Sequence, residues 1–191
     1  ITGLTNDTGL EIVGKYLELL KEIVPNIRRV ALLLNPIPPG AANYRKAAEN
    51  AATRLGVGIT VVEVRGRDEL ESAFAAIARE RVDAVVVQAD PIYFTARKQI
   101  VDLTVKYRLP AVFHAREVVE SGGLLSYGGS LDYQFRRAAT FVDKILRGTP
   151  PGEIPIEQPT KFELVINTRT AKELAVAIPQ SMLLRADEVI Q

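Results

Sequence analysis

The sequence predicts an α/β protein in which a doubly wound parallel sheet carries helices on both faces. Three observations support this fold class. Short apolar runs such as residues 28–34 and 84–88 are continuous rather than alternating, as expected for strands covered on both sides. Helical patterns separate these runs and indicate β-α-β units with right-handed crossovers. The chain has 191 residues, of which 47% are hydrophobic, enough for one substantial core.

Strands and helices alternate regularly through the first 123 residues. Thr8 and Glu11 have the spacing of a capping box at the start of a helix over 8–24, and Asp68 and Glu71 repeat this spacing at the start of a later helix. Apolar runs and helical periodicity locate the other elements. The expected strands cover 28–34, 59–64, 84–88 and 111–113, and the remaining helices cover 41–56, 69–81, 92–107 and 116–121.

The pattern changes after residue 123. "GLLSYGG" reads as a strand between glycines, and a helix with an apolar stripe is expected over 131–147. The proline-rich stretch 148–163 predicts an extended, irregular segment, because proline cannot continue a helix or a central strand. A strand over 162–167 and a helix starting at Thr168 follow, and the apolar C-terminal tail is expected to pack on the body.

Composition argues against several classes of function. Lys and Arg total 24 against 23 Asp and Glu, a net charge of +1, which argues against a nucleic-acid partner. The chain has no cysteine and one histidine, so neither a thiolate metal site nor a protein-built zinc site is expected, and we expect no cofactor or metal. The lack of cysteine also fits an oxidising compartment such as a periplasm. No apolar run approaches the length of a membrane span.

Polar or proline-bearing loops follow three of the expected strands. Asn35 and Pro36 follow the first strand, Asp90 follows the third and His114 follows the fourth. Ligands of open α/β sheets bind beyond the carboxyl ends of the strands. We therefore expect these three loops to line a cleft.

The same positions also allow structural interpretations. Asp90 stands before a proline at a helix start, where aspartate is a typical N-cap. Asn35 is equally suited to a turn, and a lone His114 at a strand end is more often structural than catalytic. Of Tyr93 and Phe94, in the first turn of the helix, one is expected to face the cleft and the other to join the core.

Catalytic signatures are absent from the sequence. It contains no phosphate-binding loop, no G-x-G-x-x-G, no G-x-S-x-G and no H-E-x-x-H. We therefore expect no catalytic residues and favour binding without chemistry. An enzyme with Asn35, Asp90 and His114 in its active site is a further hypothesis, and Arg116 is expected either at the cleft or paired with Glu117.

Three segments carry a family resemblance: the N-terminal "ITGLTNDTGLEIVGKYLELLKEIVPNIRRVALLLNP", "GGLLSYGGSLDYQFRRAATFVDKILRGTPPGEIPIEQPTKFELVINTRTAKEL" and "IPQSMLLRADEVI". Over essentially its whole length the chain resembles the ABC-transporter substrate-binding proteins of the tryptophan/tyrosine-transport type. That family is similar to the type I periplasmic binding proteins, in which two α/β lobes hold a ligand between them. The resemblance implies a solute-binding component of an ABC importer, with a small-molecule ligand, a membrane permease as partner and a periplasmic or extracytoplasmic location.

The resemblance also implies a division of the chain. Residues 4–124 and 162–191 would form the ligand-binding lobe two, and 125–161 would provide hinge crossings and a remnant of lobe one, most of which this chain would lack. The helix over 131–147 would then lose its cover, and the chain would self-associate through it. The side chains left exposed would be Phe135, Val142 and Ile145.

An amino acid, aromatic or otherwise, or a related small carboxylate is the ligand class that the resemblance implies. Asp90 would take the ammonium group, and Asn35 and backbone amides near 38–44 would take the carboxylate. Ser126, Tyr127 and Asp132 would approach from the hinge, and an aromatic ligand would stack on a neighbouring ring. The residues expected at the ligand are Asn35, Pro36, Gly40, Tyr44, Asp90, Tyr93, Phe94, His114, Arg116, Ser126, Tyr127 and Asp132.

An alternative is the effector-binding domain of a cytosolic transcription regulator, which uses the same two-lobed fold. The two hypotheses differ in what they require upstream of this sequence. A secretion signal would support the importer component, and a helix-turn-helix would support the regulator.

Overall fold

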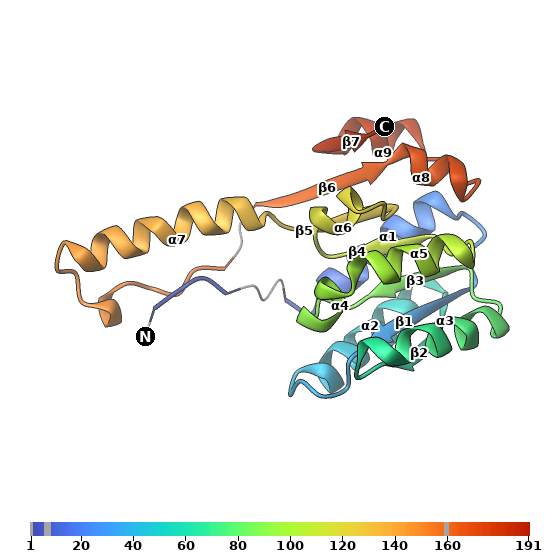
Figure 1. Cartoon of the computed structure of the whole chain (residues 1–191), viewed down its shortest axis with the longest axis horizontal. Coiled ribbons are helices and arrows are strands. Elements are labelled where there is room, and N and C mark those ends of the chain that lie inside the picture. Colours follow the sequence, from blue (N-terminus) through green and yellow to red (C-terminus); the bar gives the residue numbers. More distant parts are fainter. Residues whose placement is uncertain (1, 6–8, 159–160) are drawn as a thin grey trace.

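A computed structural model describes residues 2–5, 9–158 and 161–191 and contains a seven-stranded sheet with helices on both faces (Figure 1). The strand order is β2-β1-β3-β4-β5-β6-β7, and every neighbouring pair is parallel except β5 and β6. The predicted α/β class is therefore confirmed. The strands are β1 (Arg29–Leu34), β2 (Gly58–Glu63), β3 (Ala84–Val87), β4 (Ala111–Phe113), β5 (Leu125–Gly129), β6 (Phe162–Asn167) and β7 (Glu188–Ile190).

Two apolar cores lie on opposite faces of the sheet. The helices α1 and α2 cover one face, and α3, α4 and α5 cover the other. Residues of β1 alternate between the cores, with Leu32 in the first and Leu33 in the second, which explains why the strand is apolar throughout. The helices are α1 (Ile12–Ile23), α2 (Ala41–Leu55), α3 (Leu70–Arg79), α4 (Pro91–Thr95), α5 (Arg97–Lys106), α6 (Arg116–Glu120), α7 (Leu131–Leu146), α8 (Thr168–Glu173) and α9 (Gln180–Arg185).

The structure differs from the sequence predictions at several helix starts. The helix expected over 92–107 is divided at Ala96 into α4 and α5. A 3₁₀ turn precedes α3, and no side chain caps it, so the capping role expected of Asp68 is wrong. The side chain of Glu69 instead accepts a backbone N–H of the preceding loop. Thr8 lies outside the described residues, and Glu11 makes no capping hydrogen bond to α1.

β5 belongs to the body of the molecule. It pairs in parallel with β4 and antiparallel with β6, so residues 125–129 lie inside the sheet rather than outside it with the segment 130–158. The chain leaves the sheet after β5 and returns to it at β6 from the same end, which makes this pair antiparallel. Sequence reasoning expected a parallel sheet and did not anticipate the reversal.

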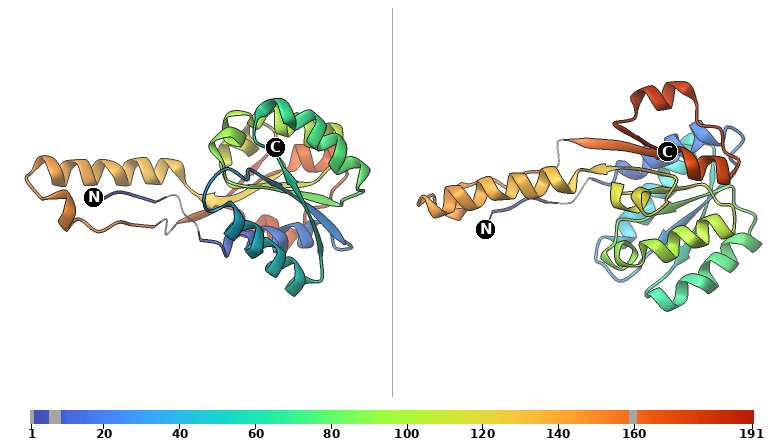
Figure 2. Two further views of the ribbon diagram at one scale, coloured as in Figure 1. Left: turned by 90° about the horizontal axis from the view of Figure 1, so that it is seen from below. Right: turned by 45° about the horizontal axis from the view of Figure 1, so that its top comes forward.

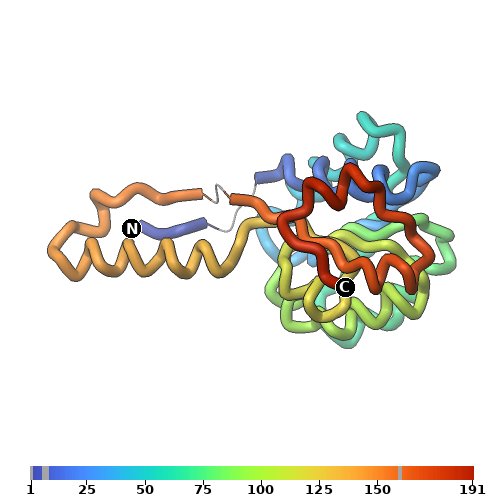
Figure 3. The backbone as a smooth tube through the Cα atoms, turned by 90° about the horizontal axis from the view of Figure 1, so that it is seen from above, coloured from blue at the N-terminus to red at the C-terminus, as the bar shows by residue number. Residues whose placement is uncertain are grey.

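An arm projects from the sheet at this end. It consists of α7, residues 147–158 running back along α7, and residues 2–5 beside them (Figures 2 and 3). The backbone N–H of Thr5 donates to the carbonyl of Glu157 at 3.0 Å, and the N–H of Glu157 donates to the carbonyl of Gly3 at 3.1 Å. These hydrogen bonds join residues 2–5 to the returning segment 147–158. Arg137 of α7 donates two hydrogen bonds to Glu157 of that segment, of 2.7 and 2.6 Å.

The other side of α7 carries exposed apolar side chains. Only Phe141 of this helix is buried. The exposed set, here called the outer stripe, comprises Phe135, Val142, Ile145 and Leu146, with exposed fractions of 75%, 54%, 36% and 81%. The expected exposure of Phe135, Val142 and Ile145 is therefore confirmed. No helix in the described part of the chain is long and apolar enough to cross a membrane.

Candidate functional site

A cavity of about 380 Å³ opens at the carboxyl ends of β3, β4 and β5, on the side from which the arm projects. Because neighbouring parallel strands end at the same edge of a sheet, loops that are far apart in the sequence meet there. The lining residues are Ala89, Asp90, Pro91, Phe94, His114, Ala115, Gly129, Leu131 and Gln134.

A buried hydrogen-bond network joins the ends of β1 and β3. The backbone N–H of Asn35 donates to Oε1 of Gln88 at 2.9 Å, and Nδ2 of Asn35 donates to Oδ2 of Asp90 at 2.9 Å. The Oδ1 atom of Asn35 accepts the N–H of Ile37 at 3.1 Å. Asn35 is therefore both a turn former and the residue that orients the carboxylate of Asp90.

Asp90 also caps a helix. Its Oδ1 atom accepts the N–H of Ile92 at 2.8 Å, and Pro91 occupies the first position of α4. The side chain is buried, with 5% exposed, yet it lines the cavity. In the described part of the chain no lysine or arginine forms an ion pair with it. The result is a rigidly held carboxylate without a cationic partner, directed at an open space.

An aromatic wall stands beside this carboxylate. The rings of Phe94 and His114 lie with centroids 6.0 Å apart at 53°, and the guanidinium of Arg97 lies 5.1 Å from the centroid of Phe94 on α4. The Nδ1 atom of His114 is buried and has no hydrogen-bond partner among the described residues. Burial lowers the pKa of His114 to about 4, although the charge of Asp90 acts in the opposite direction. At neutral pH the site therefore presents a neutral imidazole beside the side chain of Asp90.

The pKa of His114 predicts a loss of stability in acid. Its pKa is about 4 when folded and 6.5 in an unfolded chain, so between these values the unfolded chain takes up a proton that the folded chain does not. The free energy of unfolding should fall by up to about 3 kcal/mol as the pH drops from 7 to 4. Urea unfolding at several pH values, with His114→Gln as the control, measures this contribution. An equal acid dependence in both proteins would contradict it.

Two expected site residues pack in the cores instead. Tyr93 is buried against the second core, and its hydroxyl donates to the carbonyl of Val64 at 2.8 Å. Burial, with the charge of Asp90 adding to it, raises the pKa of this hydroxyl. Tyr44 packs against the first core, on the opposite face of the sheet. Phe94 is therefore the member of the Tyr93–Phe94 pair that faces the cavity.

Two other expected residues form ion pairs on the surface. Arg116 contacts Glu188 of β7 as well as Glu120 and Glu163, and does not pair with Glu117 as the sequence suggested. Asp132 pairs with Arg136 one turn along α7, with 69% of its side chain exposed. Neither residue lines the cavity. Acidic side chains hold Arg116, and Arg136 holds Asp132.

The remaining expected residues surround the site without lining the cavity. Ser126 is buried in β5, and within the described ranges its Oγ atom has no hydrogen-bond partner. Tyr127 stacks on Phe162 of β6, with centroids 5.6 Å apart at 17°. Pro36 and Gly40 lie in the partly exposed loop between β1 and α2.

Sequence reasoning missed several residues of the site. Gln88 ends the apolar run of β3, and a polar side chain at that point is the signal that could have found it. Gln134 and Leu131 lie at the start of α7, and nothing in the sequence indicates that this helix begins beside the end of β4. The contact depends on how β5 pairs with β4.

The composition of the site is that of a binding site. Within the described residues no group of three or more His, Cys, Asp or Glu side chains is placed to hold a metal ion. The cavity combines one fixed carboxylate, a neutral imidazole, an aromatic ring and an amide. Such a site can bind a small ligand that has a cationic group and an apolar portion.

The structure is an α/β fold whose candidate site lies at the carboxyl edge of the sheet, the usual position of ligand sites in such folds. The sequence model of the family described as "ABC transporter substrate binding protein" matches residues 1–190. The chain therefore belongs to this family, which is one of non-enzymatic binders.

Known proteins similar to this chain include two solved structures and one curated sequence. A conserved domain protein from Vibrio cholerae shares 26% identity with a TM-score of 0.88, over 98% of this chain and 62% of that protein. An ABC domain from Streptococcus pneumonia, solved in complex with L-Trp, shares 23% identity with a TM-score of 0.84, over 99% and 64%. The tyrosine-binding protein of Clostridioides difficile is 19% identical over 162 residues, covering 85% of this chain and 47% of that protein. The chain thus spans about half of the length of this curated relative.

Proposed function

We propose that this chain is the ligand-binding part of an extracytoplasmic solute-binding protein of an ABC importer, and that its ligand is an amino acid, preferably an aromatic one. The chain binds the ligand without chemistry and delivers it to a membrane permease. Family membership supports the importer role, and the similar proteins named for tyrosine and crystallised with L-Trp support the ligand class.

The carboxylate of Asp90 is the observation that carries this proposal. Its two oxygen atoms are held by Asn35 and by the N–H of Ile92, and it has no cationic partner. A buried carboxylate is costly unless it is compensated, and a ligand ammonium compensates it with a charge-assisted hydrogen bond. The ligand therefore carries a primary ammonium group.

The rest of the cavity favours an aromatic or large apolar side chain on that ligand. The ring of Phe94 and the imidazole of His114 provide surfaces for edge or offset stacking. A volume of about 380 Å³ suits an amino acid.

A panel of four related ligands tests the proposal by calorimetry. L-tryptophan and L-tyrosine should bind, and N-acetyl-L-tryptophan, which lacks the ammonium charge, should bind about 100-fold more weakly. Tryptamine keeps the ammonium and lacks the carboxylate, so it should bind better than the N-acetyl compound. Equal binding of tryptophan and N-acetyl-tryptophan would refute the role of Asp90, and no binding by any member would refute the ligand class.

We also propose the division into lobes that the family resemblance implies. Residues 4–124 and 162–191 act as lobe two, the ligand-binding lobe, and 125–161 supply hinge crossings and a piece of lobe one, with β5 itself pairing into the sheet of lobe two. The similar structures are longer than this chain, which covers 62% and 64% of them. In this chain the outer stripe of α7 is free to pair with a second copy.

If two copies of the chain associate through the outer stripe, charged side chains placed on that stripe should dissociate the dimer. Phe135 and Leu146 are the most exposed members of the stripe, so replacing both by lysine should weaken dimerisation about 100-fold or more. Light scattering after size exclusion measures the mass over a concentration series. Leu184→Lys is the matched control, because Leu184 is 78% exposed on α9 of the body. A wild-type chain that stays monomeric at high concentration would contradict the prediction.

A further inference from the structure

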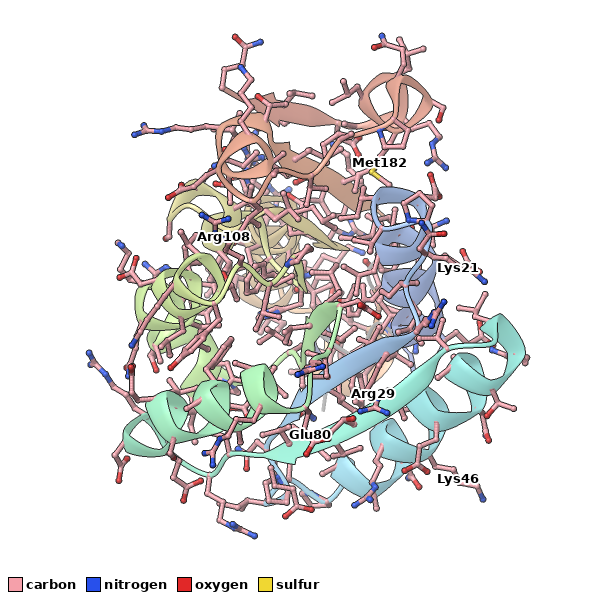
Figure 4. All side chains as sticks on the ribbon, turned by 90° about the vertical axis from the view of Figure 1, so that its right-hand side faces the viewer. Lys21, Arg29, Lys46, Glu80, Arg108 and Met182 are labelled. Atoms are coloured by element: carbon pink, nitrogen blue, oxygen red, sulfur yellow. The ribbon has the colours of Figure 1, made fainter. Side chains whose placement is uncertain are left out.

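A cluster of arginines lies at the amino-terminal edge of the sheet, at the end of the molecule opposite the arm and the cavity. It comprises Arg28, Arg29, Arg79, Arg81 and Arg108, all exposed, and is called the basic edge below. Figure 4 views this end directly and labels Arg29 and Arg108 on it. Neither the candidate site nor the proposed function uses these residues.

The loops that carry the basic edge lie side by side because they enter neighbouring strands. Arg28 and Arg29 precede or begin β1, Arg81 lies before β3 and Arg108 lies before β4. The N–H of Asp83 donates to the carbonyl of Arg29 at 2.8 Å, which joins the first two loops. The N–H of Val85 donates to the carbonyl of Pro110 at 2.9 Å, which joins the second and third.

Most of the positive charge at this edge is unpaired. Among the described residues only Arg29 of the five has an ion pair, at 3.6 Å from Glu80. Asp83 is the other acidic residue on these loops, and its Oδ2 atom already accepts the N–H groups of Arg28 and Arg29 at 2.7 and 2.9 Å. The edge therefore presents an extended surface of net positive charge.

Two of these arginines occupy backbone positions that favour glycine. Arg81 has a φ of 51° and Arg108 a φ of 52°, both at turns that end a helix. Gly56 occupies the equivalent left-handed position after α2. Any residue with a Cβ atom is strained there, and helix C-termini favour a cation without requiring it at that position. Ala175 has the same left-handed backbone without a charge, with a φ of 56°, so the strain alone does not single out the arginines.

We propose that the basic edge is a peripheral docking surface for an anionic phospholipid membrane. Specific protein interfaces are anchored by exposed apolar or aromatic side chains. In the described part of the chain none of the large exposed apolar residues lies on these three loops. A set of unpaired arginines without such anchors fits the diffuse negative charge of a lipid surface. In this contact the arm and the cavity point away from the membrane, so the chain leaves the lipid surface before it delivers a ligand to a permease.

Co-sedimentation with phospholipid vesicles tests this proposal. Binding should be strong on vesicles of phosphatidylcholine with 30% phosphatidylglycerol, weak on pure phosphatidylcholine, and lost at 0.5 M salt. The variant Arg81→Gly/Arg108→Gly should bind the anionic vesicles about 25-fold more weakly, about five-fold for each arginine. Because glycine relieves the backbone strain, the same variant should gain about 2–4 °C in Tm for each position.

Ala175→Gly is the matched control. Ala175 is exposed and has a φ of 56°, so glycine relieves the same strain there without removing a charge. This variant should gain Tm and bind vesicles as the wild type does. Equal vesicle binding by the double arginine variant would overturn the proposal, as would equal binding to neutral vesicles, which would assign the contact to the outer stripe of the arm. Binding to poly-L-glutamate but not to anionic vesicles would also overturn it, in favour of an acidic protein partner.

Discussion

Gly128→Ala should destabilise this protein by about 3 kcal/mol or more and should disorder the candidate site. A Cβ atom built at Gly128 would lie 1.8 Å from the carbonyl oxygen of His114 and 2.9 Å from its carbonyl carbon. Both are backbone atoms, so the clash can be relieved only by moving β5 or the loop after β4. That loop holds His114 at the cavity, so ligand binding should be lost together with stability.

A second glycine provides the matched control. Gly14 lies within α1, and a Cβ atom there would meet Ala51 at an ordinary 3.7 Å. Gly14→Ala should therefore stabilise the protein by about 0.5–1 kcal/mol, because alanine is the better helix former. Guanidinium unfolding of the two variants measures both effects. If Gly128→Ala unfolds at the same denaturant concentration as the wild type, the close approach of β5 to the His114 loop is not a constraint on the fold.

Asp90→Asn should lower the affinity for a ligand ammonium about 100-fold. The change keeps the shape of the side chain and removes the charge that a cationic ligand would neutralise. It also disturbs the network, because an asparagine at this position has only one oxygen for the two donors, Asn35 and the N–H of Ile92. Loss of binding by this variant could therefore be attributed to either effect.

An exchange of the two side chains separates the effects. In the double variant Asn35→Asp/Asp90→Asn, the new amide can donate to the new carboxylate, which still accepts the N–H of Ile37. The network is kept, and the charge moves from the cavity lining to a residue behind it. Stability should return toward the wild type while affinity stays low. Recovery of affinity in the double variant would show that the network, rather than the charge of Asp90, determines binding.

The positions of the key polar residues could be predicted because they follow from local rules. Continuous apolar runs indicate strands that are covered on both faces, and parallel strands all end at one edge. Asn35 and His114 stand directly after such runs, and Asp90 follows its run after Gln88 and Ala89, so their convergence needed no knowledge of side-chain packing. The outer stripe was equally visible, because helical periodicity identifies an apolar stripe whether or not anything covers it.

The orientation of individual side chains could not be predicted in this way. Tyr93 and Phe94 are adjacent on one short helix, and only the position of the Val64 carbonyl directs Tyr93 inward and leaves Phe94 at the cavity. Arg116 was a candidate for the cleft, but residues of β6 and β7 far along the chain hold it on the surface. Each outcome depends on partners that are distant in the sequence.

The sequence by itself determined the fold class, the edge of the sheet at which the candidate site lies, and the residues that bring polar groups to that edge, because periodicity and strand ends are local properties of the chain. Only the tertiary structure decided which aromatic ring lines the cavity, that Asn35, itself bonded to Gln88, holds Asp90 in place, that Gly128 must lack a side chain, and that β6 runs antiparallel to β5. These features arise from contacts between separate loops and strands, and their geometry exists only once the sheet has assembled.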